Sequence, residues 1–153
     1  MLSNIIVGIS NLPAYYAIKL SFNNSDYLTC AALSFVFSAS FISHLTENHK
    51  HGMSGIGFSP KTSYILNRFD VLGCIINIIR FGYLYYSKYG TNFNVLIENK
   101  TLIYFSLLSF LLLRISEYDK YNPKLKNIYI MTHCLWHISI FTLIYHFLDK
   151  IIY

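Results

Sequence analysis

The chain has 153 residues, of which 54% are hydrophobic, 18% aromatic and only 12% charged, with a net charge of +5 spread over 12 Lys and Arg. An ordinary soluble domain carries about 25% charged residues, disordered chains are poor in aromatic residues, and nucleic-acid-binding proteins concentrate basic residues in a patch. These three classes are therefore excluded. The composition indicates a single-domain, all-α protein, a multi-pass bundle of transmembrane helices.

Five stretches are long and apolar enough to be considered as membrane-spanning helices, each of which needs about 20 residues. We expect them at residues 2–20, 27–46, 63–87, 97–116 and 127–148. The first contains Pro13, which a membrane helix tolerates as a kink, and it lacks the basic start and the cleavage site of a signal peptide. The fourth is short, and it spans a bilayer only if Lys100 and Arg114 reach the two interfaces.

The segments between these helices indicate loops and an orientation. Residues 45–62 contain Gly, Pro, His and Lys and are predicted to form an irregular, exposed loop, in which His49 and His51 are solvated. Residues 115–126 are charged and interrupted by a proline. Seven Lys and Arg fall on the side of the N-terminus and these two loops and five on the other side, which predicts a cytosolic N-terminus.

Cysteine indicates no further chemistry. The chain has three cysteines, an odd number, and they show no CxxC spacing. We expect Cys30, Cys74 and Cys134 to be small hydrophobic residues of the helices rather than part of a disulfide framework.

An unpaired charge within a membrane span costs several kcal/mol and marks a candidate functional site, and four ionisable side chains of the predicted spans stand out. They are His44, Asp70, His133 and His137. The last two are spaced i, i+4 and share one helix face, and Ser40 stands in the same relation to His44. If successive helices alternate in direction, a rise of ~1.5 Å per residue places all four groups in the same half of the membrane.

Three imidazoles with one open position are the ligand set of a catalytic zinc ion. A carboxylate such as Asp70 can then orient and deprotonate water, and Ser40 can donate a hydrogen bond to a ligand or to a developing oxyanion. Two other interpretations stay open: the histidines are satisfied core groups, and Asp70 pairs with Arg68 or Arg80. Haem ligation is disfavoured because the chain has no CxxCH motif, and His146 lies too far along its helix to be a ligand.

At these residues the sequence resembles the CREST superfamily of membrane hydrolases and receptors, which includes alkaline ceramidases, progestin and adiponectin receptors and GPI-anchor-remodelling lipases. The matching motifs are S-x3-H in one helix, an Asp early in the next and H-x3-H in the last: Ser40 to His44, Asp70 in RFDVLG, and His133 to His137. The branch with the GPI-specific phospholipase and myomaker-type fusion proteins is the most similar. The resemblance implies that the three His bind Zn²⁺. Family members usually have seven helices, and the two missing here would fall between Asp70 and His133.

The leading interpretation is a zinc-dependent intramembrane hydrolase that cleaves a lipid amide or ester bond, in a ceramide-like or acyl-ester substrate. A second is a non-enzymatic, receptor-like or fusion-related membrane protein in which a structural zinc ion joins three helices. A third is a small membrane protein without metal. A cavity that reaches the metal from the lipid side would distinguish the first interpretation from the second.

Overall fold

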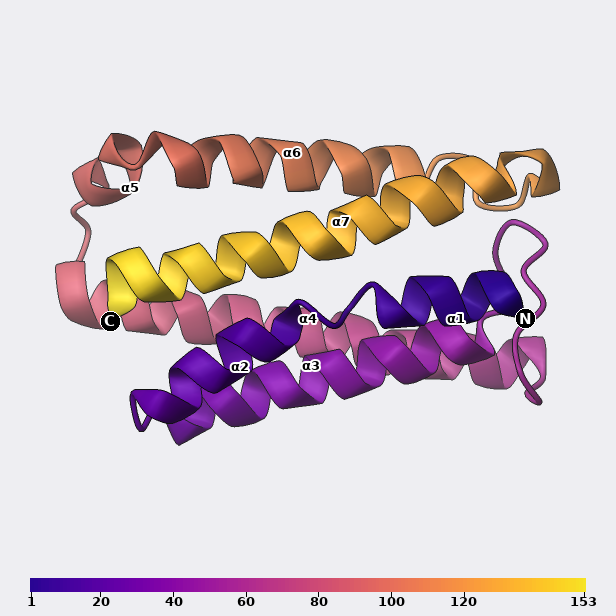
Figure 1. Ribbon diagram of the computed structural model, residues 1–153, viewed down its shortest axis with the longest axis horizontal. Helices are drawn as coiled ribbons and strands as arrows, with labels where there is room; N and C mark the ends of the chain where they lie inside the picture. Colours follow the sequence, from indigo (N-terminus) through magenta and orange to yellow (C-terminus); the bar gives the residue numbers. More distant parts are fainter.

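A computed structural model describes residues 1–153 and is built from helices alone (Figure 1). The α-helices are α1 (Leu2–Ile9), α2 (Ala14–Asn23), α3 (Tyr27–Thr46), α4 (Pro60–Tyr89), α5 (Asn94–Glu98), α6 (Lys100–Ser116) and α7 (Lys126–Phe147). A 3₁₀ turn, η1 (Pro123–Leu125), precedes α7, and a π-helical turn, η2 (Leu148–Ile152), follows it. The all-α class predicted from composition is confirmed.

The long helices run along one axis of the molecule and alternate in direction (Figure 1). The pair α1–α2 runs from the N-terminus to the far end, and α3, α4, α6 and α7 then reverse direction in turn, so that the two chain termini lie at opposite ends. Helix α3 packs against α1, α2 and α4, while α7 packs against α1, α2 and α6. The ends of α3 and the starts of α4 and α7 are consequently gathered at one end of the bundle.

Three helical segments are long and apolar enough to cross a membrane, which is compatible with the membrane protein predicted from the sequence. They are Leu2–Asn23, Tyr27–Thr46 and Pro123–Ile152. They coincide with the first, second and last of the five predicted spans. The other two predicted spans are also helices, but they are not both long and apolar enough to cross a membrane by the same measure. Helix α4 contains several polar residues, and α6 has only 17 residues.

The first predicted helix, 2–20, is interrupted between α1 and α2. Pro13 has no amide hydrogen, so the regular ladder is replaced by tighter turns across residues 10–13. The Asn11 side chain, which is fully buried, donates to the Gly8 carbonyl at 3.2 Å and adds to the backbone hydrogen bonds of this turn. At this break the half-buried Ser10 contacts His137 of α7.

The prediction of an exposed loop at 45–62 is wrong for its first part. Glu47, Lys50, His51 and Met53 are all buried at the end of the bundle. The His51 ring, predicted to be solvated, stacks on Tyr129 of α7 with the ring centroids 4.7 Å apart. The Gly and Pro residues correctly predict irregular backbone here. They do not predict whether the polar side chains form hydrogen bonds inside the fold.

The polar residues of α4 turn inward and are paired. Arg80 donates to the Asp26 carboxylate at 2.7 Å and to the Thr29 hydroxyl at 2.9 Å, and Asn77 donates to the Ala32 carbonyl at 2.9 Å. These contacts join α4 to the first part of α3, at the end of the bundle away from Glu47. The pairing of Asp70 with Arg80, one of the alternatives left open above, does not occur, because Arg80 is engaged with Asp26.

Close packing of α3 on α4 predicts that Gly73→Ala destabilises the protein. A Cβ atom at Gly73 would lie 2.9 Å from the Cα and Cβ atoms of Val36 in α3, whereas a Cβ at Gly82 in the same helix meets nothing within 4 Å. Overpacking of this kind costs about 1–3 kcal/mol, and each kcal/mol corresponds to roughly 2–4 °C in melting temperature. Thermal unfolding in detergent, followed by Trp136 fluorescence, should show this loss for Gly73→Ala. Equal melting temperatures for Gly73→Ala and the control Gly82→Ala would contradict the packing described here.

Candidate metal centre

The three predicted histidine ligands lie together in the interior. His44 is in the last turn of α3, and His133 and His137 are one turn apart on α7; each is no more than 3% exposed. One ring nitrogen from each of the three lies within 4.8 Å of the others, and the Nε2 atoms of His44 and His133 are 3.3 Å apart. The helical period explains why His133 and His137 share a face. The packing of α1 and α2 against both α3 and α7 brings His44 to them.

Each imidazole is held at Nδ1 by a residue from a different part of the chain. The pairs are His44 with Glu47 at 3.2 Å, His133 with Ser116 at 3.2 Å, and His137 with Ser10 at 2.7 Å. A ligand histidine is commonly oriented in this way, by a partner on the ring nitrogen that does not face the ion.

These partners are compatible with a proton on Nδ1 of each ring. The Ser10 hydroxyl lies 2.7 Å from the Val7 carbonyl and the Ser116 hydroxyl 2.9 Å from the Leu113 carbonyl. When each serine proton goes to that carbonyl, the hydroxyl accepts from the imidazole beside it. The Glu47 carboxylate is an acceptor for His44. In this tautomer each ring has a lone pair on Nε2.

A lone pair on each Nε2 makes the cluster a site for a cation. With the protons on Nδ1, the facing Nε2 atoms of His44 and His133 have no hydrogen between them at 3.3 Å, and the buried Nε2 of His137 has no hydrogen-bond partner. Converging lone pairs repel one another, and a cation bound to all three relieves that repulsion. The three buried histidines can therefore hold a metal ion, and imidazole nitrogen suits Zn, Cu, Fe and Ni.

The predicted carboxylate lies beside the cluster but is not part of it. Asp70, on α4, is buried, with 8% of its surface exposed, and α4 packs against the helix that carries Ser40 and His44. Ser40 lies one turn before His44 and is also buried. The group of candidate ligands contains only the three histidines. Of the five predicted site residues, the structure brings the three histidines together, while Ser40 and Asp70 are buried on α3 and α4 and are not part of that group.

Glu47, which contacts His44, was not among the site residues predicted from the sequence. Burial by itself would raise the pKa of its carboxyl group, but the hydrogen bond from His44, the charge of Lys50 and a hydrogen bond from Tyr129 lower the pKa to about 2. The group is ionised at neutral pH. Its position three residues after His44, on the same side of the helix end, was a readable signal. Ser10 and Ser116 had none, because nothing in their local sequence relates them to a histidine.

The other histidines stay outside the cluster. His146 contacts Phe105 on α6 with ring centroids 6.3 Å apart and is not among the three candidate ligands. His49 pairs with the Ser63 hydroxyl at 2.8 Å, and His51 packs on Tyr129.

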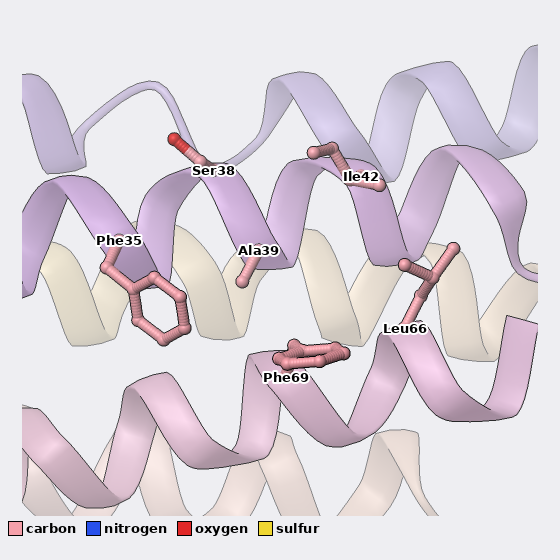
Figure 2. Close-up of a pocket in the computed structure, with 6 residues that line it drawn as sticks. All are labelled: Phe35, Ser38, Ala39, Ile42, Leu66 and Phe69. Atoms are coloured by element: carbon pink, nitrogen blue, oxygen red, sulfur yellow. The ribbon is translucent and has the colours of Figure 1, made fainter.

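An apolar groove of about 210 Å³ runs between α3 and α4 (Figure 2). Its lining residues are Phe35, Ser38, Ala39 and Ile42 of α3 with Leu66 and Phe69 of α4. The α3 residues recur at i, i+3, i+4 and i+7, so they form one face of that helix, and Ser40 and His44 lie on another. The groove is smaller than the roughly 300–1,000 Å³ of typical ligand pockets, and no residue of the metal centre lines it.

Comparison with known proteins identifies a viral relative. The chain is 57% identical over 152 residues to a protein of Acanthamoeba polyphaga mimivirus described as "Uncharacterized protein L282", and the match covers 99% of this chain and 100% of the relative. No family model matches the chain, and no solved structure matches it.

The geometry predicts that metal binding depends on His133 and His137 but not on His146. Purified protein should carry about one metal ion per chain, because three converging imidazoles define one site. His133→Ala and His137→Ala each leave two ligands and should lose the ion, which elemental analysis of the purified variants measures. His146→Ala, on the same helix, is the control and should retain it. Full metal content in both of the first two variants would show that the ion binds elsewhere.

Proposed function

We propose that this chain, which belongs to the same family as the mimivirus protein, is a zinc-dependent intramembrane hydrolase of a lipid amide or ester bond. The observation that carries the proposal is the ligand count. Structural zinc sites almost always have four protein ligands, whereas catalytic sites have three and leave one position open. Here three histidines converge, no fourth His, Cys, Asp or Glu joins them, and a carboxyl group lies close by without being a ligand. The resemblance to the CREST superfamily supports the same proposal.

The residues around the histidines suit hydrolysis. Zinc in such a site is a Lewis acid toward a carbonyl group and makes water a nucleophile near neutral pH. Asp70, a buried carboxyl group on the helix packed against α3, would accept a proton from water and pass it to the leaving group of the substrate. Ser40, one turn from His44, is placed to donate a hydrogen bond to the oxygen on which negative charge develops. A lipid substrate fits a site enclosed by apolar helices.

We further propose that α4 and α6 complete a five-span bundle. The polar residues that lower the hydropathy of α4 are buried or paired, as shown above for Arg80 and Asn77. The side chains that α4 exposes are largely aliphatic or aromatic: Ile65, Phe69, Val71, Leu72, Ile75, Ile76, Ile78, Ile79, Tyr83 and Tyr86. The exposed face of α6 is similar, with Ile103, Tyr104, Leu107, Leu108, Phe110, Leu111 and Ile115. Helices with such outer surfaces are suited to contact lipid.

A second candidate function is a membrane protein in which zinc has a structural role. Two observations favour it. The three imidazoles are almost completely enclosed, and no residue of the metal centre lines the apolar groove between α3 and α4 that Figure 2 shows. A zinc ion there would join α3 to α7 without meeting a substrate.

Substitution of Asp70 distinguishes the two functions. In a hydrolase, Asp70→Asn should keep zinc, because the three histidines remain, but should lower turnover by about 10²–10⁴-fold. Ser40→Ala removes a single hydrogen bond and should cost about 10–100-fold. The measurement is a lipidomic comparison of cells that express the wild type, each variant or the control Glu98→Gln, together with zinc analysis of the purified proteins. Unchanged ceramide, lysolipid and fatty-acid levels with zinc present would support the structural role instead.

The proposed topology has its own test. With five spans and more Lys and Arg on the side of the N-terminus, that end and the loop around Ser54 should be cytosolic and the C-terminus should be on the other side. Glycosylation tags inserted near Ser54 and after Tyr153 should be modified only at the second position. Modification near Ser54 alone would reverse the orientation, and modification at both positions would contradict an odd number of spans.

A further inference from the structure

The segment immediately after α3 is buried in a way that the proposed catalytic residues do not explain. Glu47 is 0% exposed, Lys50 8% and His51 1%. Burying charged side chains is costly unless each is paired. The partners of these buried side chains connect the segment to the neighbouring histidines.

Glu47 connects one predicted ligand to the helix that carries the other two. Its Oε2 atom accepts from Nδ1 of His44 at 3.2 Å and also from the hydroxyl of Tyr129 on α7. Tyr129 lies one helical turn before His133, and the two rings pack with their centroids 5.0 Å apart. A single carboxylate thus touches a ligand on α3 and a neighbour of the ligands on α7.

An ion-pair chain leads from Glu47 toward the surface. Lys50 Nζ lies 3.6 Å from Glu47 Oε1 and 2.9 Å from Glu117 Oε1, and Glu117 is 34% exposed. Burial by itself would lower the pKa of Lys50, but the charges of Glu47 and Glu117 raise it. The buried carboxylate is therefore held in place by a lysine whose own second partner lies at the edge of the bundle.

The same segment also holds the partner of His133. His51 adopts the left-handed conformation (φ 47°), which is uncommon for a residue other than glycine. Its amide donates to the Lys120 carbonyl at 2.6 Å, and its ring lies 3.3 Å from the carbonyl oxygens of Ser116 and Asn122. A strained conformation persists only where its surroundings fix it. The segment therefore joins the end of α3 to the end of α6, where Ser116 contacts His133.

The negative charge of Glu47 would also stabilise a cation bound to the three histidines. Three neutral imidazoles contribute no negative charge, so a divalent cation bound to them alone would place two positive charges in a buried site. A carboxylate bonded to a ligand histidine offsets part of this charge and raises the basicity of that histidine.

We infer that Glu47 is a positioning residue of the metal centre: it accepts the Nδ1 proton of His44, aims Nε2 at the ion, and is itself held by Tyr129 and Lys50. This inference rests on the metal site of the proposed function. It assigns to the segment 47–51 the role of coupling the ligand on α3 to those on α7, which the spacing of the histidines does not provide.

The test is the Zn²⁺ affinity of the purified protein, measured by competition with a chelator of known affinity. Glu47→Gln keeps the shape of the side chain but removes its charge, and it should raise the Kd for Zn²⁺ by about 10–100-fold. Tyr129→Phe removes one of the hydrogen bonds to Glu47 and should raise the Kd by a smaller factor. The matched control is Glu117→Gln, the same chemical change at the partly exposed end of the ion-pair chain, which should alter the Kd by less than about fivefold.

Two further measurements separate positioning from a general structural role. The visible absorption of Co²⁺-loaded protein reports the coordination geometry, and it should change in Glu47→Gln but not in Glu117→Gln. The melting temperature of the metal-free protein reports folding alone. A Glu47→Gln variant that melts earlier without metal but binds Zn²⁺ with the wild-type Kd and gives the wild-type Co²⁺ spectrum would overturn the inference.

The outcomes also distinguish this inference from the proposed function. A wild-type protein that binds no Zn²⁺ would contradict both. A wild-type protein that binds Zn²⁺, together with an unaffected Glu47→Gln variant, would contradict the inference alone. If Glu47→Gln does not fold, Tyr129→Phe provides the test, because it keeps the ring and removes only the hydroxyl that donates to Glu47. An unchanged Kd for Zn²⁺ in Tyr129→Phe would then overturn the inference.

Discussion

Three imidazole rings turn the same nitrogen toward one point in the interior of a bundle with few charges. Each ring makes a hydrogen bond at its other nitrogen, to Ser10, Glu47 or Ser116. With the protons on these Nδ1 atoms, the three rings can bind one cation through Nε2. The three hydrogen-bond partners come from three places: the end of α1, the end of α3 and the end of α6. The site therefore depends on how these three helix ends are positioned.

The break at Pro13 and the burial of the segment after α3 each place a hydrogen-bond partner beside one of the three histidines. The helix over residues 2–20 is interrupted near Pro13, and at the interruption the half-buried Ser10 contacts His137. An exposed loop after α3 would remove Glu47 from His44. Both departures from regular, solvated structure thus place a polar side chain against a histidine.

The distribution of polar contacts along the bundle shows how a chain with so few charges holds its helices in register. At the end opposite Glu47, Arg80 links α4 to Asp26 and Thr29 at the start of α3. Near the other end, Glu47 and Tyr129 link α3 to α7. Apolar packing between the helices is largely non-directional, so these few directional contacts at the two ends define how the helices are placed along one another.

The sequence by itself determined the helical class, the approximate bounds of the helices and which site residues share a helix face. Runs without charged residues mark the helices, and the 3.6-residue period places His133 beside His137 and Ser40 beside His44 whatever the rest of the chain does. Only the tertiary structure decided that His44 meets the α7 histidines and which groups hold the three rings. Ser10 and His137 are 127 residues apart in the chain, and no local pattern relates them. The burial of Glu47 and His51 was also decided there, because a turn-forming sequence specifies the backbone conformation, while the partners of its side chains come from helices that pack against it from elsewhere in the chain.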